Sequence, residues 1–457
     1  MNLLTIAIKN IRQRMLASLL TSLSVAIGVM LMVTVLVVNG IVEKNFSNNS
    51  AGYNLVVGRK GSELDLVMST MYRFGKPIEN LPYQYYQELK KLPFVADAIP
   101  FAIGDYTQKG GFPIVGTTAR YFELEYAPGK DFLLEKGGAH MTGRFDAIVG
   151  ANVARGNDWK RGDKFQLLHG GADAESNHAH DEMFTVVGIL APTGTANDKT
   201  VFIQLDGFYQ IAGHEKPAKE SIKQLRRFYG LPTLSPEEME KEVARLTKGD
   251  DGHHQEEHHL HEIPDEMKEV TAVLLRTKPK YLTAEILWKG SLKKGYQAQA
   301  ANPTDVMQRL KNTFILPFKY LMYALTTMII IVSGISIFVS IYNSMADRKR
   351  EIAIMRALGA QRQTVFSIIL IESIILCLCG GIFGVLFGHG LTFIAAPLIE
   401  FFIKNQSAGQ IGLVINPWAF EPLEMVLIPA MILLASLAGF IPGLTAYHTD
   451  VAEALSE

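Results

Sequence analysis

Four long stretches without Asp, Glu, Lys or Arg dominate the pattern of apolar and polar positions. They cover residues 15–42, 320–346, 373–399 and 425–449. A helix needs about 20 apolar residues to cross a bilayer, and it satisfies its backbone hydrogen bonds within one segment. Each stretch therefore predicts a transmembrane helix. The first is too long for a signal-peptide core and lacks a small-residue cleavage site, so we interpret it as a retained anchor.

The distribution of Lys and Arg predicts the orientation of these helices. Three basic residues precede the first helix and five lie at 347–362, whereas 401–422 contains only Lys404. Positive charge near helix ends favours the cytoplasmic side. The predicted order is a cytoplasmic amphipathic segment (1–14), a first transmembrane helix (15–42), an extracytoplasmic domain (43–316), a second helix (317–346), a cytoplasmic loop (347–362), a third helix (363–400), an extracytoplasmic loop (401–422), a fourth helix (423–449) and a cytoplasmic tail (450–457).

The polar region between the first two helices predicts a large mixed α/β domain. Short apolar runs bounded by Gly, Asp and Pro are typical of strands. We expect strands at 53–57, 113–116, 147–150, 165–168, 184–190, 200–203 and 270–276, and helices at 81–91, 206–211 and 303–312. The charge-rich stretch near 213–267 has few large apolar residues. It indicates an insertion that is either an exposed helical segment or a loop.

Composition excludes several functional classes. Lys and Arg number 44 against 45 Asp and Glu, so the net charge of -1 does not favour an electrostatic nucleic-acid binder. The chain has no G-x-x-x-x-G-K-[ST] phosphate loop, no G-x-S-x-G and no H-E-x-x-H. No catalytic residue is therefore predicted. Both cysteines, Cys377 and Cys379, lie in the third predicted helix, so the external domain folds without disulfides.

The basic loop at 347–362 has the pattern of a short amphipathic helix. Ile352, Met355 and Leu358 occupy neighbouring helical positions, and charged residues fill the others. Gly359 falls where a helix would end in a left-handed residue. Two interpretations remain open. The loop either fixes topology by its charge alone or is a docking helix for a cytoplasmic partner.

Several motifs, in order along the chain, resemble those of the MacB/FtsX-type (type VII) ABC transporter permease family. The strongest is REIAIMRALGAQRQTV at 350–365, followed by Glu372. The remaining motifs are AIKNIRQR at 7–14, AIG at 26–28, FDAIVG at 145–150, RGD at 161–163, VVGILAPTGTAND at 186–198 and AEAL at 452–455. The one-plus-three helix order around an extracytoplasmic MacB-like domain also fits this family.

The resemblance implies a non-catalytic permease of the bacterial inner membrane with a large periplasmic domain. Family members pair as dimers and assemble with cytoplasmic ABC ATPase subunits, which bind the ATP, so no intrinsic cofactor is expected. Closure of the ATPases would move the cytoplasmic helix and change the shape of the external domains. Periplasmic partner proteins are a further expectation. The residues expected to couple to the ATPase are Arg350, Glu351, Met355, Arg356, Leu358 and Gly359.

The third predicted helix carries two features of its own. Gly380, Gly384 and Gly388 recur at four-residue spacing, and small residues on one stripe let helices pack closely in lipid. The pattern predicts a helix contact but does not identify the neighbour. Glu372 is an ionisable group near the start of this helix. We favour an interfacial carboxylate over a transmembrane switch.

Histidine is concentrated in the external domain. Ten of the 12 His lie between His140 and His261, and the densest tract is DDGHHQEEHHLHE at 250–262. Imidazole with nearby carboxylates suits Zn, Ni or Cu(II). The candidate ligands are His253, His254, His258, His259 and His261. The alternatives are a solvated insertion without a role, weak metal capture or sensing, and a catalytic zinc site.

Three functional hypotheses follow. The leading one is a transport subunit that uses a separate ATPase to act on an extracytoplasmic substrate, with zinc or another divalent metal suggested by the His tract. The second is a permease for lipoprotein or lipid extraction. The third is a regulatory scaffold that, like FtsX, controls a cell-wall hydrolase. The large external domain and the 186–198 motif favour transport.

Overall fold

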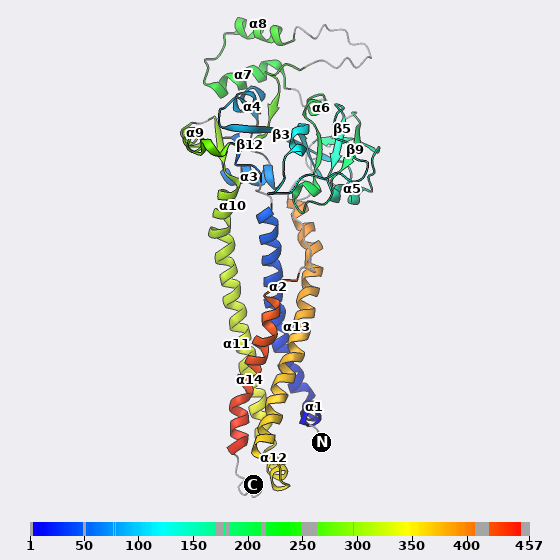
Figure 1. Cartoon of the computed structure of the whole chain (residues 1–457), viewed down its shortest axis with the longest axis vertical. Coiled ribbons are helices and arrows are strands. Elements are labelled where there is room, and N and C mark those ends of the chain that lie inside the picture. The colour runs from blue at the N-terminus through cyan, green and yellow to red at the C-terminus, as the bar shows by residue number, and fades with distance from the viewer. Residues whose placement is uncertain are drawn as a thin grey trace. The chain divides into compact units, whose positions relative to one another are not determined.

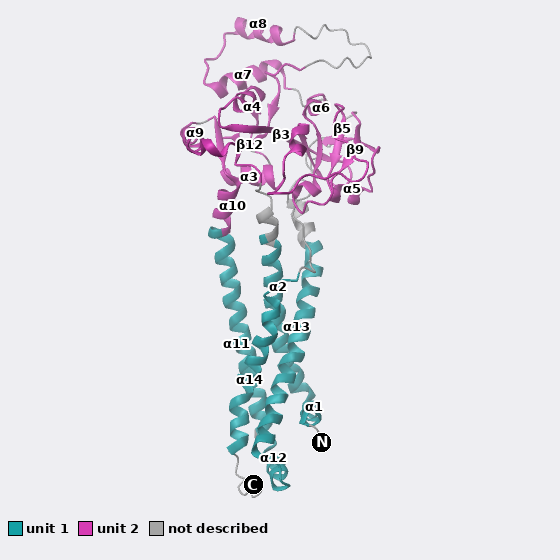
Figure 2. Cartoon of the chain, viewed as in Figure 1, with its two compact units in different colours: residues 1–43, 312–398, 415–457 teal, residues 44–311, 399–414 magenta. Residues whose placement is uncertain are grey.

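The computed structural model describes most of the chain and divides it into two compact units. The described residues are 3–48, 52–75, 77, 79–169, 178–179, 182–211, 216–247, 263–295, 297–406 and 420–448. Unit 1 comprises Met1–Glu43, Asn312–Leu398 and Ile415–Glu457, and unit 2 comprises Lys44–Lys311 and Ile399–Val414 (Figure 2).

Unit 1 is a bundle of long apolar helices that run alongside one another (Figure 1). Its helices are α1 (Leu3–Gln13), α2 (Met15–Asn48), α11 (Leu316–Asp347), α12 (Lys349–Ala357), α13 (Arg362–Gln406) and α14 (Glu424–His448). Four helical spans are long and apolar enough to cross a membrane: Met15–Ile41, Pro303–Met345, Arg362–Leu398 and Glu424–His448. The predicted set of four transmembrane helices is confirmed.

The bundle core consists of aliphatic side chains contributed by every long helix. Val33 of α2, Ile337 of α11, Cys377 of α13 and Ala435 of α14 are fully buried together. Many other apolar side chains of the same helices are exposed in the isolated chain, as expected for surfaces that face lipid.

Unit 2 is built on a mixed sheet that has eleven strands within the described residues. The strand order is β13-β1-β12-β3-β4-β10-β5-β9-β6, and β7 pairs with β3 and β8. A separate ribbon joins β2 and β11. The strands are β1 (Leu55–Arg59), β2 (Leu81–Pro82), β3 (Val95–Thr107), β4 (Pro113–Thr117), β5 (Asp146–Val149), β6 (Lys164–Phe165), β7 (Leu167–His169), β8 (His178–Ala179), β9 (Phe184–Ile189), β10 (Val201–Gln204), β11 (Glu269–Val270), β12 (Ala272–Thr277) and β13 (Ala298–Ala301).

Helices cover this sheet and connect its strands. They are α3 (Glu63–Met71), α4 (Tyr83–Lys90), α5 (Ala151–Asn157), α6 (Leu205–Tyr209), α7 (Ala218–Tyr229), α8 (Pro236–Thr247), α9 (Leu282–Lys294) and α10 (Pro303–Leu310), with short 3-10 turns η1 (Ala119–Glu123), η2 (Ala196–Lys199) and η3 (Pro279–Tyr281) and a π-helical turn η4 (Lys311–Ile315). Successive side chains of a strand point to opposite faces. Leu55 and Val57 of β1 therefore enter one core, whereas Val56 enters the other.

The mixed α/β fold is confirmed, with local differences from the expected elements. The strand expected at 165–168 is two short strands, β6 and β7, and the helix expected at 81–91 begins only after the β2 ribbon. The longest strand, β3, is absent from the sequence prediction. It contains Pro100, Gly104 and two Asp, and much of it is buried on both faces, so it lacks the usual polar alternation.

The insertion expected near 213–267 contributes helices α7 and α8 to the fold. Ile222 and Phe228 of α7 and Met239 of α8 are buried in the core that covers one face of the sheet. The helical alternative is therefore correct for the described residues, but the insertion is not wholly exposed. Residues 212–215 and 248–262, which include the His tract at 250–262, lie outside the described residues.

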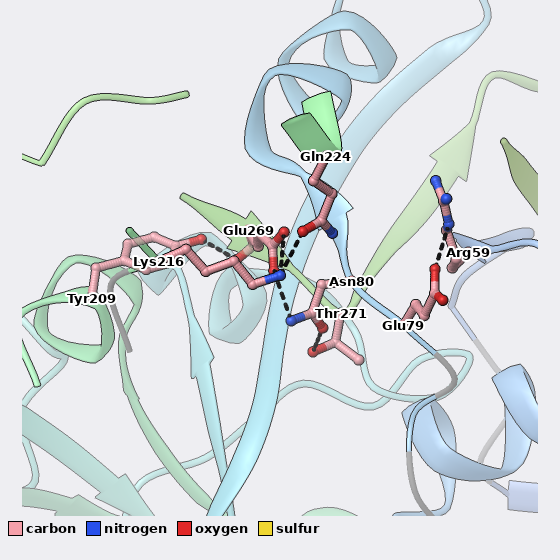
Figure 3. Close-up of polar contacts among 8 residues, drawn as sticks. All are labelled: Arg59, Glu79, Asn80, Tyr209, Lys216, Gln224, Glu269 and Thr271. Atoms are coloured by element: carbon pink, nitrogen blue, oxygen red, sulfur yellow. Dashed lines mark hydrogen bonds and ion pairs between the residues drawn. The ribbon is translucent and has the colours of Figure 1, made fainter. Parts of the chain in front are cut away.

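Polar contacts anchor the beginning of this insertion beside β11 (Figure 3). Lys216 Nζ lies 3.0 Å from Glu269 Oε2 and donates to Gln224 Oε1 at 2.6 Å. Asn80 Nδ2 donates to Glu269 Oε2 at 3.1 Å. The Tyr209 hydroxyl donates to the Glu269 carbonyl. A single glutamate thus connects α7, β11 and the segment before β2.

Candidate coupling site in the helical bundle

Helix α12 occupies the basic loop between two transmembrane spans, and one side of it packs into the bundle. Ile352 and Ala353 are buried, and Met355 packs against the same core. At the start of the helix, the Ile352 amide donates to the Arg348 carbonyl at 3.0 Å. The Arg348 side chain also pairs with Glu351 at 2.9 Å. This apolar side determines which residues of α12 remain accessible.

The end of α12 has the geometry expected at Gly359. Gly359 has a φ of +100°, a left-handed conformation that Gly adopts without a steric penalty. The Gly359 amide donates to the Arg356 carbonyl at 3.1 Å, and the Ala360 amide donates to the Met355 carbonyl at 3.0 Å. These bonds satisfy carbonyls that the helix leaves open, so α12 stops before α13 begins.

The accessible side of α12 combines apolar and charged groups. Leu358 is 83% exposed and Ile354 is 45% exposed. They lie four residues apart and therefore on one side of a helical turn. Arg350 and Glu351 are also exposed. We call Ile354, Leu358, Arg350 and Glu351 the α12 face.

The position of Leu358 corrects one detail of the predicted amphipathic pattern. Leu358 does not share the buried side of Ile352 and Met355. The Leu358 amide still donates to the Ile354 carbonyl at 3.0 Å, so the helical turn extends to this residue. At 3.6 residues per turn, six residues rotate Leu358 about 120° away from Ile352, which places it on the side of Ile354 instead. Arg356, another expected coupling residue, is half-buried.

A buried polar network connects the start of α12 to two other helices. Arg348 donates from Nη2 to Asn10 Oδ1 on α1, and the Asn10 side chain is also hydrogen-bonded to Glu372 on α13. Asn10 and Glu372 are 7% and 8% exposed. Arg348 and Arg14 place positive charge near the Glu372 carboxyl group. Buried polar groups are costly unless paired, so each of these groups depends on the others.

The glycines of α13 lie against α2 of the same chain. A Cβ placed on Gly384 would lie 2.6 Å from Val29 Cβ and 2.7 Å from the Ala26 carbonyl oxygen. Equivalent atoms at Gly380 and Gly388 would lie 2.5 Å from the Ser22 carbonyl oxygen and 2.9 Å from Val33 Cβ. Each distance is shorter than a normal Cβ contact. Only a residue without Cβ therefore permits this approach of the two helices.

Sequence reasoning did not single out Asn10 or Arg348 as functional. Asn10 was one polar residue on a short amphipathic segment, and Arg348 was one of five basic residues in the loop at 347–362. The contact between them joins residues separated by 338 positions. Its only local signal is a polar side chain on the buried side of α1, beside Ala7.

The candidate metal ligands are not placed by the structure. All five, His253, His254, His258, His259 and His261, lie outside the described residues. Within the part of the chain that the structure describes, no group of three or more His, Cys, Asp or Glu could hold a metal ion.

The apolar spans and the large α/β domain between the first two of them define a membrane protein with a periplasmic domain. Two family models match the chain. The MacB-like periplasmic core domain matches residues 18–234, and the FtsX-like permease C-terminal domain matches residues 323–451. The chain belongs to the MacB/FtsX-type family of ABC transporter permeases.

Individual relatives match shorter parts of the chain. ABC transporter permease YtrF of Bacillus subtilis is 27% identical over 146 residues, which are 32% of this chain and 34% of that protein. Macrolide export ATP-binding/permease protein MacB of Vibrio parahaemolyticus is 30% identical over 156 residues, or 34% of this chain and 21% of that protein. The matched regions thus span about a fifth to a third of these relatives.

A solved structure of the periplasmic region of MacB from Actinobacillus actinomycetemcomitans is also similar to part of the chain. It is 10% identical, covers 60% of this chain and 98% of its own length, and has a TM-score of 0.31.

Proposed function

We propose that this protein is the non-catalytic permease subunit of an ABC transporter in a bacterial inner membrane. In this proposal a separate cytoplasmic ATPase binds and hydrolyses ATP, and a pair of permeases converts its closure into a conformational change of the periplasmic domain. The α12 face supports the proposal most directly. It exposes Leu358 and Ile354 beside charged groups, and the same helix contacts α1 and α13 through buried partners.

The chemistry of the α12 face suits a protein groove. An exposed aliphatic pair gains free energy when a partner covers it, and the flanking Arg350 and Glu351 favour one register of docking. A loop that only fixed topology would need its positive charges but would have no use for Leu358. The apolar pair therefore favours the docking interpretation over the topological one.

The test is association with the ATPase subunit. Leu358→Asp and Ile354→Asp should each lower ATPase recovered with the tagged permease by at least about tenfold, because each places a charge in an apolar contact. Membrane levels should stay unchanged, because both side chains are exposed. Leu231→Asp, an exposed leucine of unit 2, is the matched control. Undiminished ATPase recovery with both α12 variants would refute docking through this face.

Orientation can be tested independently of the ATPase. In a chain whose two native cysteines are replaced by Ser, thiols introduced at Ser235 and Leu358 are both exposed to their surroundings. An impermeant maleimide applied to intact spheroplasts should label the first and not the second. Labelling at Leu358 without permeabilisation would place α12 on the wrong side of the membrane.

The clustering of His supports a second proposal, that the transporter handles zinc or another divalent metal. Ten of 12 His lie between His140 and His261, and eight residues at 253–262 are His or Glu. Such side chains supply the donors that Zn prefers. Loss of this role would leave the proposed coupling to an ATPase unaffected.

A further inference from the structure

Unit 2 contains an arginine, Arg73, with two unusual properties. Its backbone conformation is left-handed, and its charged side chain is buried. Arg73 follows the C-cap of α3 and has a φ of +57°. Helices commonly place Gly at such a position, as α7 does with Gly230 at φ +65°. A residue with a Cβ pays a strain cost there, and such strain tends to persist where the side chain has a use.

The guanidinium of Arg73 is enclosed and lacks a counter-ion among the described residues. The residue is 8% exposed, and its Nε and Nη1 have no hydrogen-bond partner in the described part of the chain. Its Cζ lies 5.0 Å from the centre of the Phe101 ring. Burial lowers the pKa of Arg73 to about 10, and among the described residues only Tyr121 opposes this shift. The charge is thus desolvated without a carboxylate to balance it.

A small cavity adjoins these unpaired donors. Its volume is about 20 Å³, and its lining includes Tyr53, Thr70, Arg73, Phe101, Tyr121 and Asn197. The Tyr53 hydroxyl and Thr70 Oγ1 are buried and, like the Arg73 nitrogens, have no hydrogen-bond partner among the described residues. The Tyr121 hydroxyl is already used, because it donates to Asn197 Oδ1 at 3.0 Å and is hydrogen-bonded to Arg73. Four unpaired polar atoms around one space are a costly arrangement if the space stays empty.

We propose that this cavity binds one singly charged anionic group of the size of a carboxylate or a halide. The Arg73 guanidinium supplies the charge and an N–H donor, and the hydroxyls of Tyr53 and Thr70 supply two more donors. Hydrogen bonds from Arg to an anion are charge-assisted and therefore stronger than neutral ones. One positive charge neutralises one negative charge. A cavity volume of about 10–15 Å³ is enough for one water molecule. This cavity, at about 20 Å³, is therefore too small for a tetrahedral phosphate or sulfate.

The cavity is lined by residues from several elements of unit 2, so a bound anion would connect these elements. Thr70 comes from α3 and Phe101 from β3, whereas Tyr121 and Asn197 come from the turns η1 and η2. Strand β3 pairs with β12 on one side and with β4 on the other, so it joins the two halves of the sheet. A bound anion would therefore stabilise the junction between α3 and the turns of the β4-β10-β5 half. The inference concerns unit 2 and is independent of the proposed ATPase coupling.

The experiment measures thermal unfolding of the full chain in detergent at constant ionic strength. Sodium gluconate, whose anion is too bulky for the cavity, is replaced stepwise by chloride or formate. The unfolding temperature should rise and saturate with the small anion. In Arg73→Met the anion concentration for half of this rise should increase at least tenfold. Tyr53→Phe should weaken the response several-fold. Arg59→Met, which removes an arginine paired with Glu79, is the matched control and should keep the full response.

Several outcomes decide the proposal. A stronger response to formate than to chloride would assign the site to a carboxylate group, and an equal chloride response would assign it to free inorganic anions. Bromide should appear beside Arg73 by anomalous diffraction. In gluconate, Arg73→Met should be at least as stable as the unmodified chain, because it removes an unpaired buried charge. The proposal would be overturned if the unmodified chain showed no anion response. It would also be overturned if Arg73→Met and Tyr53→Phe both responded as strongly as the unmodified chain.

Discussion

Arg348, at the start of α12, donates a hydrogen bond to the side-chain oxygen of Asn10 on α1. The other end of the Asn10 amide is bonded to Glu372 on α13. One amide side chain therefore links the proposed docking helix to two neighbouring helices of the bundle. Because all three groups are largely buried, a displacement of α12 would break this link or carry α1 and α13 with it.

The first prediction concerns this link. Asn10→Leu should lower ATP-dependent function of the complex, and it should destabilise the bundle by about 1–3 kcal/mol because Arg348 and Glu372 lose a buried partner. ATP turnover and thermal unfolding of the purified complex are the measurements. Replacing the exposed Glu351 by Gln, which leaves Asn10 bonded, should spare bundle stability. An Asn10→Leu complex with normal ATP turnover would show that the link transmits nothing.

The second prediction concerns the packing of α13 on α2. Gly384→Ala should destabilise unit 1 by about 1–3 kcal/mol, because the added methyl meets Val29 and the Ala26 carbonyl at less than contact distance. Gly390→Ala on the same helix meets nothing within 4 Å and is the matched control. Thermal unfolding in detergent compares the two variants. Equal unfolding temperatures would mean that the two helices do not pack this closely.

The third prediction concerns the anchor of the insertion. Glu269→Ala removes the acceptor for Lys216 and Asn80, and it should destabilise α7 by about 1–3 kcal/mol. Hydrogen exchange on α7 should accelerate accordingly. Glu242→Ala breaks a pair with Arg245 that is exposed on both sides, so it should change stability by less than about 1 kcal/mol. Unchanged exchange in Glu269→Ala would assign the anchoring to apolar contacts alone.

The fourth prediction concerns alkaline pH. Burial, with smaller contributions from Tyr86, Asp265 and Asp206, raises the pKa of Tyr83 from 10.0 to about 12. The folded state therefore favours the neutral phenol, so this stability contribution is complete below pH 10 and is lost as pH rises through about 12. In tyrosinate absorbance, Tyr83→Phe should remove a component that titrates near pH 12. Removal of a component near pH 10 instead would show that Tyr83 is solvated.

The fifth prediction concerns metal. Deleting residues 250–262 should abolish moderate zinc binding by the full chain, and this binding should weaken as pH falls towards about 6, where protons compete for imidazole. Calorimetry with and without the tract is the measurement. Association with the ATPase should be unaffected. Equal zinc binding by both chains would remove the tract as the metal site.

Local signals in the sequence were enough for the membrane spans, the end of α12 and the family. Long apolar runs can be satisfied only by helices in lipid, and Gly359 marks a helix end because it tolerates a left-handed backbone. Most strands of unit 2 were also predictable from short apolar runs. These features depend on residues that are close in the chain, so a pattern of neighbours is sufficient to specify them.

Tertiary structure decided the features that depend on residues far apart in the chain. Strand β3 looks like a loop by its composition and becomes a strand because partners bury it on both faces. The glycine stripe of α13 predicts a close contact, but only the fold selects α2 as the partner. The Asn10–Arg348 bond and the cavity at Arg73 likewise join separate segments. In each case burial makes pairing between distant groups decisive, and no local pattern records which groups will meet.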